Sequence, residues 1–253
     1  MKKLLLILMV IGLIVCLFIG CNPTVPGEGE GEGEGEGEPE EVDQVVLVEL
    51  FAQEGCSSCA IVEPILEQLA GEYNRDEIVL VEERAYGIYS LDEIRDRYEW
   101  YLPNSSDRGT PNILFNGLNQ KIYGSSTYAA IDGKISVELN KEAKILISAN
   151  RSSDSATTTI SGTIENIGSS ALDNLLINGM TFKDRGKTGL KYSVTDIFTE
   201  QEVEVSTLAS GDSYSFSFTF GDINWDGNNY HGVIFVQAPN SSKKEILQAL
   251  YID

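Results

Sequence analysis

The feature that most constrains the fold is a pair of cysteines at C-x-x-C spacing, Cys56 and Cys59, placed where a strand pattern gives way to a helix pattern. Residues 45–51 form a continuous β-favouring run, as in a buried parallel strand. From residue 60 to residue 73, apolar side chains recur at helical spacing. A helix N-terminus stabilises an anion and lowers the pKa of a thiol held there. Cys56 is therefore predicted to be the nucleophile, and Cys59 to resolve its mixed disulfides.

Other roles for this pair fit the sequence less well. The remaining cysteines, Cys16 and Cys21, belong to the N-terminal segment. A disulfide that closes so short a loop excludes little chain entropy, so a purely structural staple would add little stability. A zinc site needs about four ligands, and the only histidine, His231, is far away in the sequence. We therefore expect neither a metal nor a cofactor.

The residues that follow the cysteine pair resemble thioredoxins. Residues 59–66 (CAIVEPIL) carry a proline inside the helix pattern at the spacing that thioredoxins show after C-x-x-C. Downstream, residues 108–117 (RGTPNILFNG) resemble the thioredoxin segment in which a cis-proline precedes a strand. The resemblance covers about residues 42–142. It implies that Pro111 is cis and lies beside the cysteines, and that the Thr110 backbone pairs with a substrate chain.

The chain also departs from the thioredoxin pattern. Gly55 stands where a tryptophan usually precedes the first cysteine, and the loop before Cys56 is one residue longer. Allowing for that residue, Glu49 falls where thioredoxins keep a buried acid that relays a proton to the second cysteine. The alternative for Glu49 is an exposed carboxylate at a strand end. The dipeptide Ser57-Ser58 leaves the reduction potential, and with it the direction of electron flow, open.

An aromatic-rich stretch from Val79 to Asp107 is longer than in thioredoxins. It is interpreted either as a lid or partner surface near the cysteines, or as an amphipathic helix over residues 91–101 whose aromatic side chains pack on the sheet. Residues 121–124 are then predicted to form an edge strand, and residues 126–141 a closing helix.

The pattern changes after Lys144, where β-rich runs alternate with turn clusters. The runs cover residues 144–149, 156–166, 172–182, 190–198, 213–220, 231–238 and 245–251. About seven short strands suggest an immunoglobulin-like β-sandwich. Residues 232–249 resemble the closing hairpin of the twenty-eight-kilodalton outer-membrane-protein family, whose members join a thioredoxin-like domain to such a sandwich. The expected fold class is an α/β thioredoxin-like domain (42–142) followed by an all-β immunoglobulin-like sandwich (143–253).

The first 41 residues are not predicted to belong to a folded domain. Residues 1–20 carry a basic start, an apolar run and small residues before Cys21. They resemble a bacterial lipoprotein signal peptide, which implies that Cys21 is lipidated; the alternative is an uncleaved anchor. Both interpretations place the rest of the chain outside the cytoplasm and tethered to a membrane, either on the periplasmic side or at the cell surface. The sequence does not decide whether this membrane is the outer membrane. Residues 21–41, dominated by Gly and Glu, are predicted to be a disordered spacer.

The negative net charge of the chain limits the kinds of partner that it can bind. The formal net charge is −21, and only part of it comes from the spacer. An acidic surface repels phosphate backbones, so no nucleic-acid partner is expected. The residues from Asp222 to Asp226 have the D-x-N-x-D spacing of a calcium loop, but Val233 stands where a bidentate glutamate belongs. A strand connection rich in Gly and Asn is the alternative there.

Two functions remain in competition. The leading hypothesis is a membrane-anchored thiol–disulfide oxidoreductase that acts on protein thiols or disulfides, with an unidentified partner redox protein. Its site would comprise Cys56, Cys59, Glu49, Thr110 and Pro111. The alternative is a non-catalytic cell-envelope binding or adhesion protein in which the cysteines form an inert disulfide, since a fold does not fix a function.

Overall fold

The computed structural model describes most of the chain after the N-terminal segment. It covers residues 42–253 apart from 155–156, 222–224 and 226–228. The predicted signal segment, the lipidation site Cys21 and the spacer lie outside the described residues, as does the Asp222–Asp226 loop apart from Trp225. In the part that is described, no helix combines the length and apolar character needed to cross a membrane.

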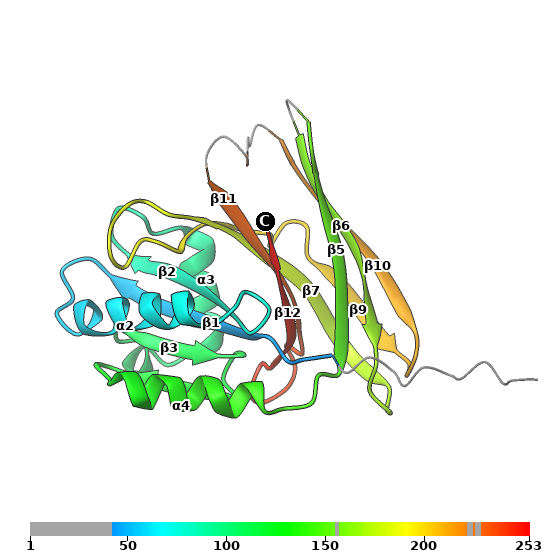
Figure 1. Ribbon diagram of the computed structural model, residues 1–253, viewed down its shortest axis with the longest axis horizontal. Helices are drawn as coiled ribbons and strands as arrows, with labels where there is room; N and C mark the ends of the chain where they lie inside the picture. The colour runs from blue at the N-terminus through cyan, green and yellow to red at the C-terminus, as the bar shows by residue number, and fades with distance from the viewer. Residues whose placement is uncertain (1–41, 155–156, 222–224, 226–228) are drawn as a thin grey trace, which may run out of the picture. The chain divides into compact units, whose positions relative to one another are not determined.

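The first half of the described chain alternates strands and helices as the sequence patterns predict (Figure 1). Its elements are β1 (Val46–Gln53), α2 (Cys59–Glu72), β2 (Ile78–Tyr86), α3 (Asp92–Tyr101), β3 (Asn112–Phe115), β4 (Gln120–Tyr123) and α4 (Tyr128–Leu139), with a short 3-10 turn at Ser105–Asp107. β1 pairs with β2 in parallel and with β3 antiparallel. An amphipathic helix over residues 91–101 is confirmed, because Tyr98 of α3 stacks on Phe51 with ring centroids 4.4 Å apart.

The second half consists of strands. They are β5 (Ile145–Ser153), β6 (Thr157–Asn166), β7 (Leu172–Lys183), β8 (Ser193–Ile197), β9 (Val203–Leu208), β10 (Ser213–Gly221), β11 (Tyr230–Gln237) and β12 (Ile246–Ile252). The seven predicted runs are confirmed as strands, whereas β9 was not predicted. β5, β6 and β10 form a three-stranded sheet. A core rich in Ile and Phe separates this sheet from β7, β9, β11 and β12.

The remaining strands form one sheet that runs through both halves of the chain. Its order is β12-β11-β7-β8-β2-β1-β3-β4, and β9 joins it by pairing with β7. The junction lies between β2 and β8, where Glu82 is opposite Ser193. A bare β2 edge would leave backbone donors and acceptors unpaired, and β8 satisfies some of them.

The expected fold class is therefore wrong. The described residues are mostly β, with three short α-helices and two sheets, and they contain no separate α/β thioredoxin-like domain beside a separate sandwich. The error has a physical origin, because local patterns identify strands but do not report which strands pair across more than 100 residues of chain. The boundary proposed after residue 142 remains a prediction, although strands from both sides of it are neighbours in one sheet.

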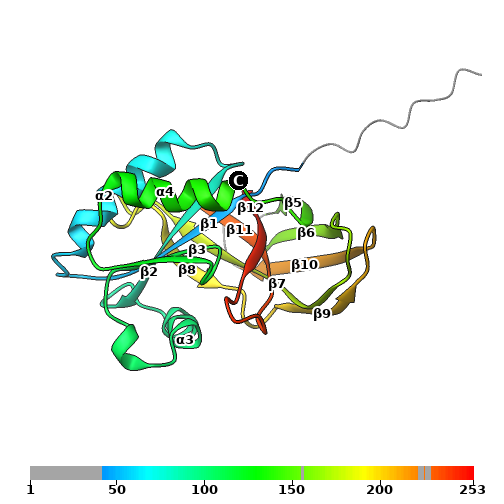
Figure 2. The same ribbon diagram turned by 90° about the horizontal axis from the view of Figure 1, so that it is seen from below.

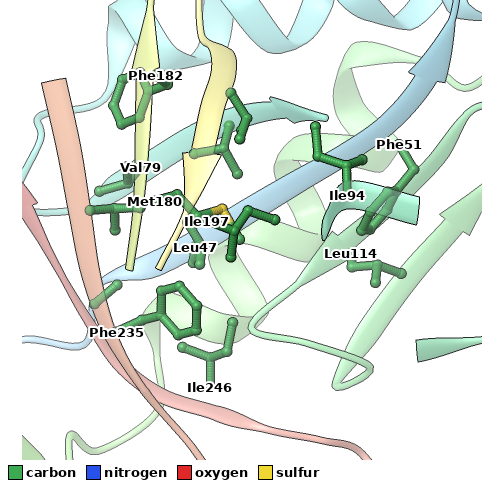
Figure 3. Packing of buried hydrophobic residues seen from close by; sticks show 14 of the residues in the cluster. Leu47, Phe51, Val79, Ile94, Leu114, Met180, Phe182, Ile197, Phe235 and Ile246 are labelled. Atoms are coloured by element: carbon green, nitrogen blue, oxygen red, sulfur yellow. The ribbon is translucent and has the colours of Figure 1, made fainter. Parts of the chain in front are cut away.

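Two apolar cores lie on opposite faces of the strands nearest the cysteines. One joins β1 and β2 to α2 and α4, and contains Cys59. The other joins β1 and β2 to α3 and also to β7, β8, β11 and β12, so both halves of the chain share it; Figure 3 shows Leu47, Val79, Met180 and Phe235 in this cluster. Figure 2 shows α2 and α4 on one side of the sheet and α3 on the other. The face that a β1 or β2 side chain takes thus decides whether it lies near the cysteines.

Because this core is shared, both halves are expected to unfold in one transition. In a Trp100→Phe variant, Trp225 is the only tryptophan and reports the second half, whereas the helical circular dichroism signal reports the first. The two signals should coincide in a urea titration. Phe235→Ala, at a fully buried position in β11, should lower the free energy of unfolding seen by both signals by about 3–5 kcal/mol. Two separate midpoints would contradict a shared core.

Candidate functional site

The two cysteines form a disulfide at the start of α2. Cys59 is the first residue of the helix and is 1% exposed, whereas Cys56, in the loop before it, is half-buried. The backbone N–H of Cys59 donates to Cys56 Sγ over 3.1 Å. The first turn carries no acidic residue, and no side chain caps it. The Cys59 N–H and the positive end of the helix dipole therefore favour a thiolate at Cys56 once the disulfide is reduced.

The segment before β3 supplies the second part of the site. The Thr110–Pro111 peptide is cis, as expected, and the carbonyl oxygen of Thr110 lies 3.5 Å from Cys56 Sγ. Tyr98 holds this segment from α3, because its hydroxyl donates to the carbonyl oxygen of Gly109 over 2.7 Å. The structure thus brings Cys56, Cys59 and Thr110-Pro111 together.

Asn112 is a supporting residue that the sequence analysis missed. Its Nδ2 also donates to the Gly109 carbonyl over 2.7 Å, and to the Tyr98 hydroxyl over 2.5 Å. Both side chains are almost fully buried. The only sequence signal that could have identified Asn112 is its position directly after Pro111.

Glu49 is not placed with the cysteines. Its carboxylate accepts from Arg97 Nε over 2.6 Å and from the Tyr101 hydroxyl over 2.9 Å, both on α3. It is fully buried, so the interpretation as an exposed strand-end carboxylate is wrong. Since strand side chains alternate between faces, Glu49 shares the face of Leu47 and Phe51, whereas Cys59 packs on the other face.

Beside Glu49 lies a second buried carboxyl, Glu83. Neither of its oxygens has a hydrogen-bond partner among the described residues. Burial raises the pKa of Glu83 well above its ordinary value, and the charge of Glu49 raises it further, while Arg97 acts in the opposite direction. The neutral form of Glu83 is therefore favoured more strongly than that of an exposed glutamate.

The face that carries Cys59 has its own charged groups, some of them buried. Arg84 of β2 pairs with Glu63 of α2 over 2.8 Å, and Lys191 pairs with Glu67 over 3.0 Å. Glu82 is fully buried, and one of its oxygens accepts from the backbone N–H of Tyr192 over 2.9 Å. Burial is the main cause that raises the pKa of Glu82 to about 8.

A pocket of about 400 Å³ opens beside Cys56. It is lined by residues 53–57, Ala60, Glu63, Arg84, Lys187, Thr188 and Leu190. The last three belong to the β7–β8 connection (184–192), which packs on α2 through a hydrogen bond of 2.5 Å from Gly189 N–H to Glu67. The sequence analysis placed only a turn cluster between the runs 172–182 and 190–198, and nothing in the sequence related this connection to the cysteines.

A larger cavity, of about 710 Å³, lies between α3 and strands β7 and β9 and includes neither cysteine. Its rim is acidic, with Glu93 and Asp96 on the helix and Glu202 and Glu204 opposite. Within the described ranges, no group of three or more His, Cys, Asp or Glu side chains is arranged to hold a metal ion.

Comparisons with known proteins identify the fold only. Neither a scan against protein-family models nor a search of curated proteins found a match. Among solved structures, HBP35 of Porphyromonas gingivalis is similar, with a TM-score of 0.64, 16% identity, and coverage of 83% of this chain and 74% of that chain. A protein of Agrobacterium tumefaciens gives a TM-score of 0.56 at 16% identity, with coverage of 82% and 93%.

A domain of the outer membrane lipoprotein Omp28 from Porphyromonas gingivalis is also among the structural neighbours. It has 14% identity, covers 44% of this chain and 88% of that domain, and has a TM-score of 0.31, which is too low to support an argument. The two stronger similarities, at 16% identity, establish a shared fold but not a shared function. The function therefore has to be argued from the geometry of the site.

The different exposure of the two cysteines predicts their order of reaction. After reduction, a short pulse of iodoacetamide at neutral pH should alkylate Cys56 well before Cys59, because Cys56 is half-buried at the helix N-terminus and Cys59 is 1% exposed. Peptide mass spectrometry after digestion measures the order. Equal labelling, or faster labelling of Cys59, would contradict the assignment of Cys56 as the nucleophile.

Burial of Glu82 predicts a pH dependence of stability. Between its ordinary pKa of 4.5 and its folded value of about 8, the folded chain keeps a proton that the unfolded chain has lost. This contribution to the free energy of unfolding therefore declines as pH rises through that window, by at most about 1.4 kcal/mol per pH unit. Urea titrations from pH 5 to pH 8 should show Glu82→Gln gaining stability relative to the unmodified protein. Parallel curves would contradict a protonated Glu82.

Proposed function

We propose that the protein is a thiol–disulfide oxidoreductase of the bacterial cell envelope, tethered through a lipid at Cys21, that acts on protein disulfides through Cys56 and Cys59. The observation that carries the proposal is the half-buried Cys56 at an uncapped helix N-terminus, with Thr110 beside it and a pocket open to it. Such a microenvironment is typical of reactive rather than structural cysteines. The envelope location is supported by the residues of the N-terminal segment.

In the reductive direction, the Cys56 thiolate attacks one sulfur of a substrate disulfide. The substrate S–S bond breaks, a Cys56–substrate disulfide forms, and the first substrate sulfur leaves as a thiolate that takes a proton from solvent. Cys59, after losing its proton, attacks Cys56 Sγ, which restores the Cys56–Cys59 disulfide and releases the second substrate sulfur. The substrate gains two electrons and the cysteine pair loses two. In the oxidative direction the same steps run in reverse.

The surroundings of Cys56 support each of these steps. The Cys59 N–H, 3.1 Å from Cys56 Sγ, stabilises the attacking or leaving thiolate. The Thr110 backbone, held by Tyr98, lies where an extended substrate segment could pair with it. The pocket walls supplied by residues 53–57 and by the β7–β8 connection would enclose the residues next to the substrate disulfide. The sequence likeness to the twenty-eight-kilodalton outer-membrane-protein family agrees with this proposal but does not identify a substrate.

Removal of either cysteine should have a distinct effect. Cys56→Ser is expected to reduce dithiothreitol-driven insulin reduction by residues 22–253 to the rate of dithiothreitol alone, because no nucleophile remains. Cys59→Ser should instead accumulate a mixed disulfide with the substrate, visible on a non-reducing gel and by mass spectrometry.

Ser125→Ala provides the control, since Ser125 is exposed in the connection between β4 and α4 and does not line the pocket beside Cys56. It should retain activity. If Cys56→Ser were as active as the unmodified protein, the oxidoreductase proposal would be abandoned in favour of a binding protein with an inert disulfide.

A further inference from the structure

The cavity between α3 and strands β7 and β9 has no part in the proposed thiol chemistry, because neither cysteine lines it. Its volume of about 710 Å³ lies within the range of roughly 300–1,000 Å³ that is usual for ligand-binding cavities. The first half of the chain contributes α3. The second half contributes β7, β9 and, through Pro239 and Asn240, the β11–β12 connection.

One side of α3 forms a wall of this cavity. Four of its residues line the cavity at helical spacing, which places them along one side of the helix: Glu93, Asp96, Arg97 and Trp100. Trp100 is 36% exposed, so its ring is accessible to a ligand.

The rim of the cavity carries an excess of negative charge. Glu93 and Asp96 lie on the helix side, and Glu202 and Glu204 lie opposite. Among the described residues, none of these four carboxylates forms an ion pair. Burial raises the pKa of Glu202 above its ordinary value, and the charge of Glu204 raises it further, against the opposing effect of Arg97. A bound cation would relieve this repulsion.

Arg97 compensates the charge of the rim only in part. Within the described ranges, it is the one basic residue that lines the cavity. Its Nε donates to Glu49 over 2.6 Å, and Glu49 does not line the cavity. The charge of Arg97 is therefore already paired with a carboxylate outside the rim.

Lys244 shows that the aromatic wall of the cavity can hold an ammonium group. Its Nζ lies 4.3 Å from the centroid of the Trp100 ring, which is a cation–π contact. Lys244 forms no ion pair within the described part of the chain, and burial lowers its pKa without a contribution from any carboxylate. Its ammonium group is therefore not the counter-ion of the rim.

The lining between the charged sides contains apolar and amide groups. Leu175, Ile197 and Val205 are its buried apolar members. Asn178, which is 3% exposed, donates through Nδ2 to Glu202 Oε2 over 3.2 Å and so holds that carboxylate at the rim. A ligand that matches this lining carries cationic groups at its ends and an aliphatic stem between them.

A metal ion does not match this arrangement. Among the described residues, no three acidic, His or Cys side chains converge on a point that could hold one, so the carboxylates are spread around the cavity. Separated negative charges are matched by a cation whose own charges are separated. We propose that the cavity binds an aliphatic polyamine, whose ammonium groups pair with the carboxylates of α3 on one side and with those of residues 202 and 204 on the other. This inference does not depend on the cysteine chemistry.

Trp100 provides a reporter in the wall of the cavity. Spermidine added to residues 22–253 should change the tryptophan fluorescence. The change should disappear in Trp100→Phe, because Trp225 is 1% exposed and does not line the cavity. This signal separates the cavity from the predicted Glu-rich spacer, to which a polycation could also bind. A change that persists in Trp100→Phe, or no change in the unmodified protein, would overturn the inference.

Calorimetric titration measures the affinity of the same complex. Glu93→Gln combined with Glu202→Gln removes one carboxylate from each side and should weaken spermidine binding by about tenfold, because two exposed ion pairs are lost. The matched control combines Asp43→Asn with Glu142→Gln, which removes the same charge at exposed positions outside the cavity and should leave the affinity unchanged. Equal weakening in the two double variants would show only attraction by the acidic surface as a whole and would contradict a site in the cavity.

The choice of probe tests the ligand class on the unmodified sequence. Diaminooctane should bind in the fluorescence assay, whereas octanediol, which has the same stem with hydroxyl ends, should not. Equal binding of the two would show that charge plays no part and would refute the proposal. A trilysine peptide tests the other source of ammonium groups on aliphatic stems. If the peptide changes the Trp100 fluorescence and spermidine does not, the ligand is a basic protein segment and the polyamine assignment is wrong.

Discussion

The pairing of β8 with β2 is the contact on which the rest of the structure depends. The N–H of Glu82 donates to the Tyr192 carbonyl over 2.8 Å, where the β7–β8 connection enters the sheet. That bond holds the connection over α2, where Gly189 and Lys191 meet Glu67. One wall of the pocket beside Cys56 belongs to this connection. A chain limited to the first half could form the disulfide, but its cysteine site would lack that wall and Glu82 would lose the cover of Tyr192.

The same strand carries two buried carboxyls in succession, and their neighbours give them different properties. Glu83 shares its face with Glu49, and burial next to that carboxyl raises the pKa of Glu83 well above its ordinary value. Glu49 in turn belongs with Arg97 and Tyr101 to a network that reaches Gln237 of β11. Glu82 faces the cysteine helix instead. Burying a carboxyl without full hydrogen bonding costs stability.

The sequence could predict the elements of this fold but not their assembly. The helices and seven of the eight later strands follow from local periodicity; the run 213–220, for example, corresponds to β10. β9 was missed because its run is short and half of its residues, Glu204, Ser206 and Thr207, are polar and exposed without strict alternation. Pairing of β8 with β2 depends on contacts across more than 100 residues, which no local pattern reports. Cys56, Cys59, Thr110 and Pro111 could be placed together because one strand–helix junction and one proline segment define them.

Glu49 shows why a buried residue is harder to assign. Strand side chains alternate, so a shift of one residue in register moves a side chain to the other face of the sheet. The loop before Cys56 was judged one residue longer than in thioredoxins, and that allowance selected Glu49. In the structure Val46, Val48, Leu50 and Ala52 are the β1 residues that share an apolar cluster with Cys59. The buried acid that does share the face of Leu50 comes from the neighbouring strand, because the β1–β2 register puts Glu82 directly across from Leu50.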